Sequence, residues 1–216
     1  MIVAAAVCPH PPALVPELAS GAADELADVR DAALAAVAEV ISHEPERIVV
    51  IGGRTASDPE DERAAGSLMG YGVDVRTEGE RIALPLSLTV GAWLLDRVGW
   101  AGRRTYANAA VPVDDRVALL VMADGTARRD VRAPGYLDER AEAYDKVIAQ
   151  ALRDGDSSAL SELDVELGDE LLAAGVRALV VLGEMTKGAV VTARLRWDGA
   201  PFGVGYWVAN WTLSAD

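Results

Sequence analysis

The chain has 216 residues, of which 51% are hydrophobic and 25% are charged, and its formal net charge is −14. This length suits one sizeable core, and the negative charge argues against binding to nucleic-acid backbones or anionic membrane surfaces, since both need clustered Lys and Arg. No apolar stretch approaches the roughly 20 residues of a membrane span, and no basic region typical of a signal peptide precedes Ile2. The single cysteine, Cys8, excludes an internal disulfide and predicts a cytoplasmic protein.

The first strand is expected over residues 2–8, where the apolar run IVAAAVC ends at Pro9. Such a run is typical of a strand that is buried on both faces of a parallel sheet. The prolines that follow lack the N–H group that a strand ladder needs. His10 is therefore predicted at the carboxyl end of a buried strand, where open α/β sheets bind ligands. The alternative is a rigid loop in which the imidazole only hydrogen-bonds a backbone carbonyl.

A helix is expected over residues 22–42, because apolar side chains recur there at helical spacing and acidic ones occupy mostly the other face. Residues 47–53, RIVVIGG, predict a second buried strand. A crossover of this length makes the two strands parallel. The polar loop that begins at Arg54 should then emerge on the same edge as His10.

The rest of the chain continues the alternation of helices and strands that is typical of α/β proteins. Helices are expected over residues 86–98, 137–153 and 157–173, the last as one helix or a pair. Strands are expected over residues 104–111, 116–122 and 176–182, with hairpins at 73–76 with 81–84 and at 189–197 with 204–211. Since no repeat or linker interrupts this order, we predict a single α/β domain over residues 1–216, with a mostly parallel central sheet flanked by helices.

Polar residues follow each predicted buried strand: His10, Arg54, Asp124 with Arg128, and Glu184. If the strands are parallel, these side chains converge on one edge of the sheet, and convergent ionisable groups in a cleft are typical of a binding site. We therefore predict them as ligand-binding residues. The alternative is that any α/β protein carries polar residues where its strands meet its loops.

Six segments together resemble a known family: the opening strand with CPHPP, the helix and second strand that follow it, the ADGTAR segment, the helix centred on Asp145 and the final GAPFGVGYWVA hairpin. They are similar to the class III extradiol ring-cleavage dioxygenases, in particular to small, actinobacterial-type members of the LigB-like superfamily, which also includes the Memo-like proteins. The resemblance covers nearly the whole chain as an order of elements. It implies a LigB-like fold and, in catechol-cleaving members, Fe(II) held by two His and one carboxylate, with a separate His that moves protons.

The resemblance implies site residues one by one. The first metal-binding His of the family matches His10, and Asp124 matches the acidic residue of the family's Ser-Asp-Leu-Ser-His segment. Arg54 follows the second strand where the family has its second metal-binding His, and the acid/base His is missing from the segment that ends at Arg128. Glu184 is the candidate for the carboxylate ligand. His10 and Glu184 are therefore the candidate metal ligands, and the set is incomplete.

The expected function is that of an extradiol dioxygenase-like oxidoreductase fold with a degenerate metal site. We expect no cofactor, with Fe(II) or another divalent metal as the alternative, and no cleavage of simple catechols. Because a cation at Arg54 favours an anion over a metal, a second hypothesis is a non-catalytic protein that binds a small anion or metabolite through His10, Arg54 and Arg128. A protein-partner scaffold is the third. The expected partner is a small-molecule ligand, not nucleic acid or a membrane, and a homo-oligomer remains open.

Overall fold

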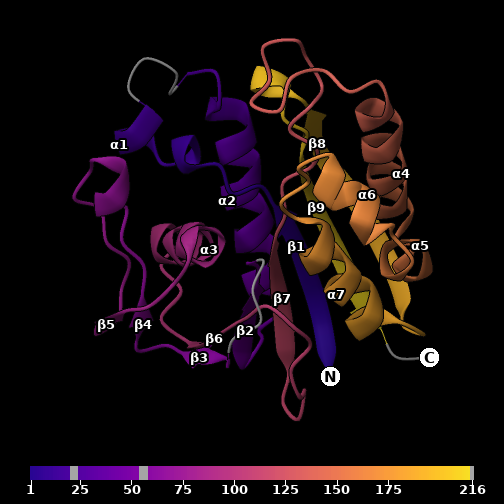
Figure 1. Cartoon of the computed structure of the whole chain (residues 1–216). Coiled ribbons are helices and arrows are strands. Elements are labelled where there is room, and N and C mark those ends of the chain that lie inside the picture. The colour runs from indigo at the N-terminus through magenta and orange to yellow at the C-terminus, as the bar shows by residue number, and fades with distance from the viewer. Residues whose placement is uncertain (20–23, 54–57, 215–216) are drawn as a thin grey trace.

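A seven-stranded sheet runs through the middle of the molecule in the order β3-β6-β2-β7-β1-β9-β8 (Figure 1). The computed structural model describes residues 1–19, 24–53 and 58–214. The strands of this sheet are β1 Ile2–Cys8, β2 Arg47–Ile51, β3 Glu60–Asp61, β6 Arg103–Ala107, β7 Val117–Met122, β8 Val190–Gly199 and β9 Tyr206–Ser214. Strands β1, β7, β2 and β6 are parallel neighbours, whereas β3, β9 and β8 each pair antiparallel with the strand beside them. The predicted fold class, a single α/β domain with a mostly parallel sheet, is confirmed.

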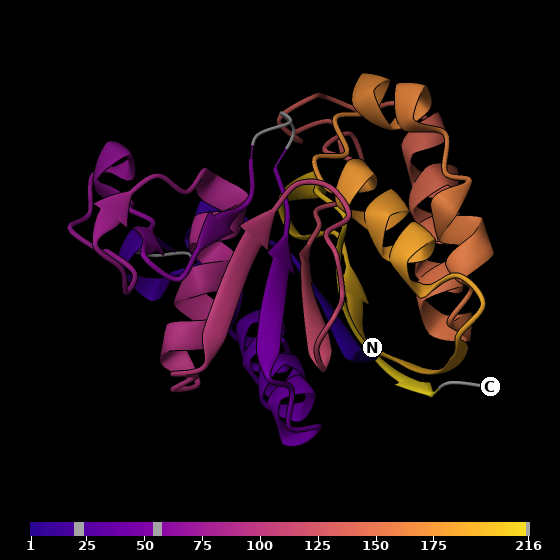
Figure 2. The same cartoon turned by 90° about the horizontal axis from the view of Figure 1, so that it is seen from below.

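Helices cover both faces of the sheet, as Figures 1 and 2 show from two directions. One face carries α1 Pro16–Ala19, α2 Ala27–Ser42 and α3 Leu86–Arg97, and the other carries α4 Arg140–Asp154, α5 Ser157–Ser161, α6 Val165–Glu170 and α7 Val176–Thr186. Short 3₁₀ turns lie at η1 Pro12–Leu14, η3 Met69–Tyr71 and η4 Pro201–Gly203. Successive side chains of a strand point to opposite faces, so β1 places Ala4 and Ala6 in the core under α2 and Ala5 and Val7 in the core under α4 and α7.

The segment at residues 176–182, predicted as a buried strand, is instead the start of helix α7. A continuous apolar run does not reveal its period, and length is the main criterion between a buried strand and a buried helix. The burial of the side chains follows the period of a helix: Arg177 and Glu184 are exposed and Val180 is half-buried, while Leu179 and Leu182 are fully buried. Helix α7 packs on the face of the sheet that also carries α4, beside β7.

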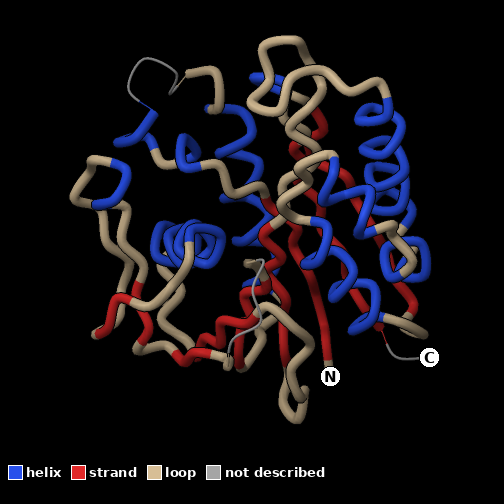
Figure 3. The backbone as a smooth tube through the Cα atoms, in the orientation of Figure 1, coloured by secondary structure: helices blue, strands red, loops and turns tan. Residues whose placement is uncertain are grey.

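Two further expectations differ from the structure. Helix α2 begins at Ala27, later than the predicted start. The second half of the predicted hairpin, β5 Arg81–Ile82, does form a strand, but its partner is β4 Ala64–Ala65, in a parallel two-stranded sheet apart from the large one. Figure 3 shows how little strand this small sheet adds beside the central one.

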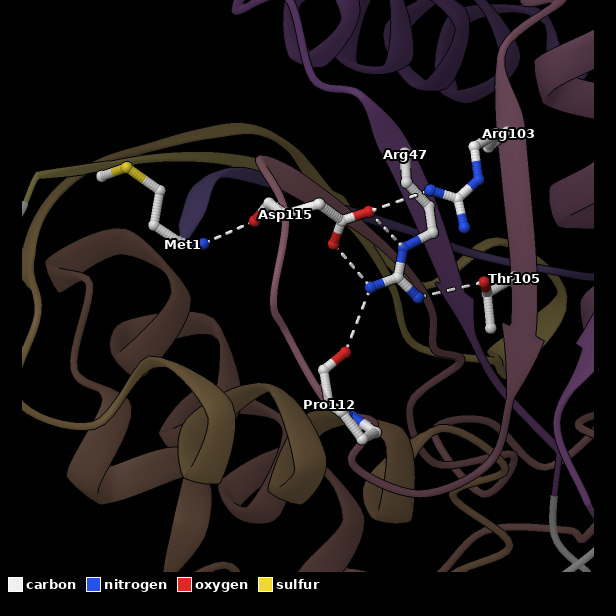
Figure 4. Close-up of polar contacts among 6 residues, drawn as sticks. All are labelled: Met1, Arg47, Arg103, Thr105, Pro112 and Asp115. Atoms are coloured by element: carbon white, nitrogen blue, oxygen red, sulfur yellow. Dashed lines mark hydrogen bonds and ion pairs between the residues drawn. The ribbon is translucent and has the colours of Figure 1, made fainter.

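A polar cluster holds the amino edge of the sheet, where β2 and β7 begin (Figure 4). The Arg47 guanidinium donates to both carboxylate oxygens of Asp115, at 3.0 and 2.7 Å, and also to Thr105 Oγ1 at 3.2 Å. The amino group of Met1 donates to the Asp115 carbonyl oxygen at 2.5 Å. The hydrogen bonds from Arg47 are the main cause that lowers the pKa of Asp115. The cluster ties the starts of three parallel strands to the turn before β7.

No helix in the described part of the chain is both long enough and apolar enough to cross a membrane.

Candidate functional site

Strands β1 and β7 are parallel neighbours whose following segments leave the sheet toward opposite faces. After β1 the chain continues to α2 on one face, and after β7 it continues to α4 on the other (Figure 1). Such a divergence is a topological switch point. Open α/β sheets in general bind ligands at such a point, outside the carboxyl ends of the strands.

His10 and Asp124 occupy this switch point, His10 after β1 and Asp124 after β7. The backbone N–H of His10 donates to Asp124 Oδ1 at 2.7 Å, and the His10 Nδ1 lies 3.5 Å from the same oxygen. Nδ1 is buried and has no hydrogen-bond partner among the described residues. His10 as a whole is 7% exposed, and the Asp124 side chain is 13% exposed. The imidazole is thus held close beside a carboxylate.

Burial raises the pKa of the Asp124 carboxyl group above its ordinary value. The nearby His10 side chain and the His10 backbone N–H both act in the other direction, because each favours the ionised carboxylate. The neighbouring Cys8 thiol, fully buried, has its pKa raised to about 12 by burial. Since the thiolate is the reactive form of cysteine, Cys8 acts as a core residue and not as a nucleophile.

Three backbone contacts fix the chain at Asp124 and Gly125. Its carbonyl oxygen accepts from the N–H of Gly175, directly before α7, at 2.8 Å. Asp124 also forms an antiparallel bridge with Tyr206 at the start of β9. The next residue, Gly125, donates to the Gly205 carbonyl at 2.7 Å. A side chain that is anchored in this way can hold a ligand at a defined position.

Asp145, on the buried face of α4, supports the loop that follows Asp124. Its carboxylate accepts from the Thr126 N–H at 3.0 Å, from the Thr126 hydroxyl at 2.9 Å and from Arg129 Nη1 at 3.0 Å. A Cβ atom at Gly125 or Gly205 would lie 2.9 or 2.3 Å from its oxygens, so the backbone approaches the carboxylate closely at both glycines. Burial raises the pKa of Asp145, although the three donors favour its ionised form.

The other residues predicted for the site do not join this pair in the described structure. Arg128 is directed into its own loop, where Nη1 donates to the Gly135 carbonyl at 2.6 Å. Glu184 is exposed near the end of α7, which starts beside Asp124 and runs toward the amino edge. At 1.5 Å rise per residue, it lies roughly 12 Å along the helix axis from Val176. The prediction that Glu184 follows a strand at the ligand edge is therefore wrong. Arg54 lies outside the described residues.

The described residues do not fit the iron site that the resemblance implies. No group of three or more His, Cys, Asp and Glu side chains in the described part of the chain is arranged to hold a metal ion. His43, the second of two histidines, lies at the end of α2, where its Nε2 is 3.5 Å from Thr212 Oγ1. Thr212 pairs with Ala4 near the start of β1, whereas His10 follows the end of that strand. The two imidazoles therefore cannot share a metal ion.

Comparison with known proteins identifies no family: neither a scan against protein-family models nor a search of curated proteins gives a match.

The residues that sequence reasoning missed as parts of the site are Asp145, Gly205 and Tyr206. A signal for Asp145 is present in the sequence, because it lies four residues after Ala141 and three before Ile148, on the apolar stripe of α4. An acidic residue on the buried face of a helix needs a partner there, and the structure supplies Thr126 and Arg129.

Proposed function

We propose that this chain is a LigB-like protein that binds a small hydroxylated aromatic compound, of the phenol or catechol type, at the switch point between β1 and β7. The observation that supports it is the His10–Asp124 pair, with a buried Nδ1 3.5 Å from Oδ1. A carboxylate close to Nδ1 favours the tautomer with the proton on that nitrogen, and in that tautomer Nε2 is a hydrogen-bond acceptor. A phenolic hydroxyl is a donor that suits this acceptor, and the resemblance to extradiol dioxygenases favours the same class of compound.

An anionic ligand is the weaker alternative. Asp124 already places a carboxylate at the site, and the chain carries a net charge of −14. In the described part of the chain, the cations that follow Asp124 form no hydrogen bond with it that would bring them to the pair: Arg128 donates to the Gly135 carbonyl and Arg129 to Asp145. A neutral hydroxyl therefore suits the described side chains better than phosphate or carboxylate does.

The proposal is one of binding, without iron-dependent ring cleavage. Two imidazole ligands, a carboxylate ligand and an imidazole acid/base are what the family chemistry uses, and His10 is the one imidazole at the switch point among the described residues. We expect catechol to bind and to remain intact under oxygen after iron loading. We propose a cytoplasmic location, which the presence of a single cysteine in the sequence supports.

Isothermal titration with catechol tests the proposal. Wild-type protein should bind catechol, and His10→Gln and Asp124→Asn should each weaken binding by about tenfold, because His10→Gln removes the imidazole acceptor and Asp124→Asn removes the carboxylate beside it. His43→Gln is the matched control, since it replaces the other histidine at the opposite end of β1, and it should bind as the wild type does. Absence of catechol binding, or binding that His10→Gln leaves unchanged, would contradict the proposal. Binding of inorganic phosphate in place of catechol would favour the anion hypothesis instead.

A further inference from the structure

A cavity of about 640 Å³ opens between the turn at residues 24–26, the loop after Thr126, the start of α4 and the η4 turn before β9. Side chains of both charges line it, with Arg129 and Arg132 as the cations and Glu25 and Glu142 among the acids. His10 and Asp124 are not among its lining residues. It is therefore distinct from the switch point and has its own chemistry.

Arg129 is a cation that the fold holds in place at the cavity wall. Its Nη1 donates to Asp145 Oδ2 at 3.0 Å, and its backbone N–H donates to the Gly203 carbonyl at 3.0 Å. Asp145 is itself buried and fixed by Thr126. A guanidinium carries five N–H donors in a planar fork, so Arg129 keeps donors for a ligand after binding Asp145. A fixed guanidinium of this kind suits a carboxylate.

Phe202, in η4, displays an aromatic ring at the cavity in an unfavourable backbone conformation. Its φ angle is 58°, in the left-handed region that favours glycine. The residue is nevertheless 46% exposed, so burial in the core does not offset the strain. Neither the backbone nor the core therefore accounts for a large apolar residue at this position. What distinguishes Phe202 from Tyr136, which is also exposed at a positive φ, is that Phe202 lines a cavity, and strained residues concentrate at functional sites.

We infer that this cavity binds a zwitterionic aromatic amino acid. The ligand carboxylate pairs with Arg129 and Arg132, and its ammonium group pairs with Glu25 and Glu142. Its ring packs against Phe202, as aromatic pairs do at centroid distances of roughly 4.5–7 Å. This ligand pairs with the basic, the acidic and the aromatic side chains of the lining. A simple anion would be repelled by the acidic side chains, and a simple cation would be repelled by the arginines.

Titration calorimetry with L-phenylalanine and two truncated analogues tests which charges the cavity needs. Phenylpropionate lacks the ammonium group, and phenethylamine lacks the carboxylate. Each should bind at least about tenfold more weakly than the amino acid, because each loses one charge-assisted contact. The inference is overturned if L-phenylalanine does not bind at roughly 10 mM, or if either analogue binds as tightly as the amino acid.

Phe202→Gly tests the aromatic contact without endangering the fold, since glycine adopts a φ of 58° without strain. We expect about tenfold weaker binding of L-phenylalanine, with a melting temperature equal to or above that of the wild type. Tyr136→Gly is the matched control: Tyr136 has a φ of 59° and is 74% exposed, but it does not line the cavity. Binding that survives Phe202→Gly, or that falls equally with Tyr136→Gly, would overturn the inference.

Discussion

Asp124 carries a carboxylate that is largely buried beside the imidazole of His10, and burial raises its pKa above the ordinary value of 3.8. Ionisation is therefore harder in the folded chain than in the unfolded chain. The stability that this group contributes is greatest below pH 3.8 and decreases as the pH rises through its folded-state pKa. A side chain that lowers stability at neutral pH is typical of a functional site, where activity and stability oppose each other.

Asp124→Asn should therefore be as stable as the wild type at pH 7, or more stable by about 1 kcal/mol, because the amide keeps an oxygen for the His10 N–H and carries no charge. The advantage of the variant should grow between about pH 4 and about pH 7. Denaturant unfolding at both pH values measures this difference in stability. Repeating both measurements in a His10→Gln background removes any contribution of the imidazole to it. A variant that loses stability relative to the wild type between the lower and the higher pH would contradict this account.

At the scale of the elements, the start of α7 fixes the backbone of Asp124. The helix begins directly after Gly175, whose N–H binds the Asp124 carbonyl. A Cβ atom on Gly175 would lie 2.3 Å from Ala123 Cα and 2.6 Å from Asp124 N. The contact is with backbone atoms, so no side-chain rotation can relieve it. The end of β7 and the start of α7 therefore fit together only with glycine at this position.

Gly175→Ala should lower the free energy of unfolding by about 2–3 kcal/mol, as overpacking in a core does, and it should weaken catechol binding by displacing Asp124. Gly70→Ala is the control, because a Cβ atom there would meet no atom within 4 Å. Denaturant unfolding compares the two variants. Equal stabilities would show that α7 does not abut β7 as described.

Several elements could be predicted from the sequence because each has a local cause. The apolar run that ends at Pro9 indicated β1 and placed His10, and two β-like runs joined by a turn indicated the C-terminal hairpin. The run after Gly175 was misassigned, since a segment apolar on nearly all sides has no visible period. That error also misplaced Glu184. The pairing of His10 with Asp124 depends on the neighbouring positions of β1 and β7, which the sheet order alone provides.

At the scale of the whole molecule, the Arg47–Asp115 cluster joins the amino ends of β1, β2 and β6 to the turn before β7 (Figure 4). Both partners are largely buried, and their hydrogen bonds are bidentate. Such contacts stabilise a fold more than exposed ion pairs do. The cluster therefore fixes the edge of the sheet opposite the site.

Asp115→Asn should lower the free energy of unfolding by about 2 kcal/mol at neutral pH, as the loss of hydrogen bonds to a charged group does. Because Arg47 lowers the pKa of Asp115 below 3.8, this stabilisation is present above that value and is lost as the pH falls through the folded-state pKa. The difference between wild type and variant should therefore narrow in acid. Asp61→Asn, in the exposed pair with Arg63, should leave the melting temperature unchanged at neutral pH. If Asp61→Asn destabilised the protein as much as Asp115→Asn does, this would contradict the role given to the Asp115 cluster.

The most direct measurement of the central claim is the NMR signal of the His10 imidazole during a catechol titration. The chain has two histidines, so the His10 and His43 ring signals can be assigned with the His43→Gln variant alone. We predict that catechol shifts the His10 signal in a saturable way and leaves that of His43 unchanged, and that Asp124→Asn reduces the affinity. A His10 signal that stays unchanged at saturating catechol, or an equal shift of both histidines, would contradict the claim that the switch point between β1 and β7 is a binding site for hydroxylated aromatic compounds.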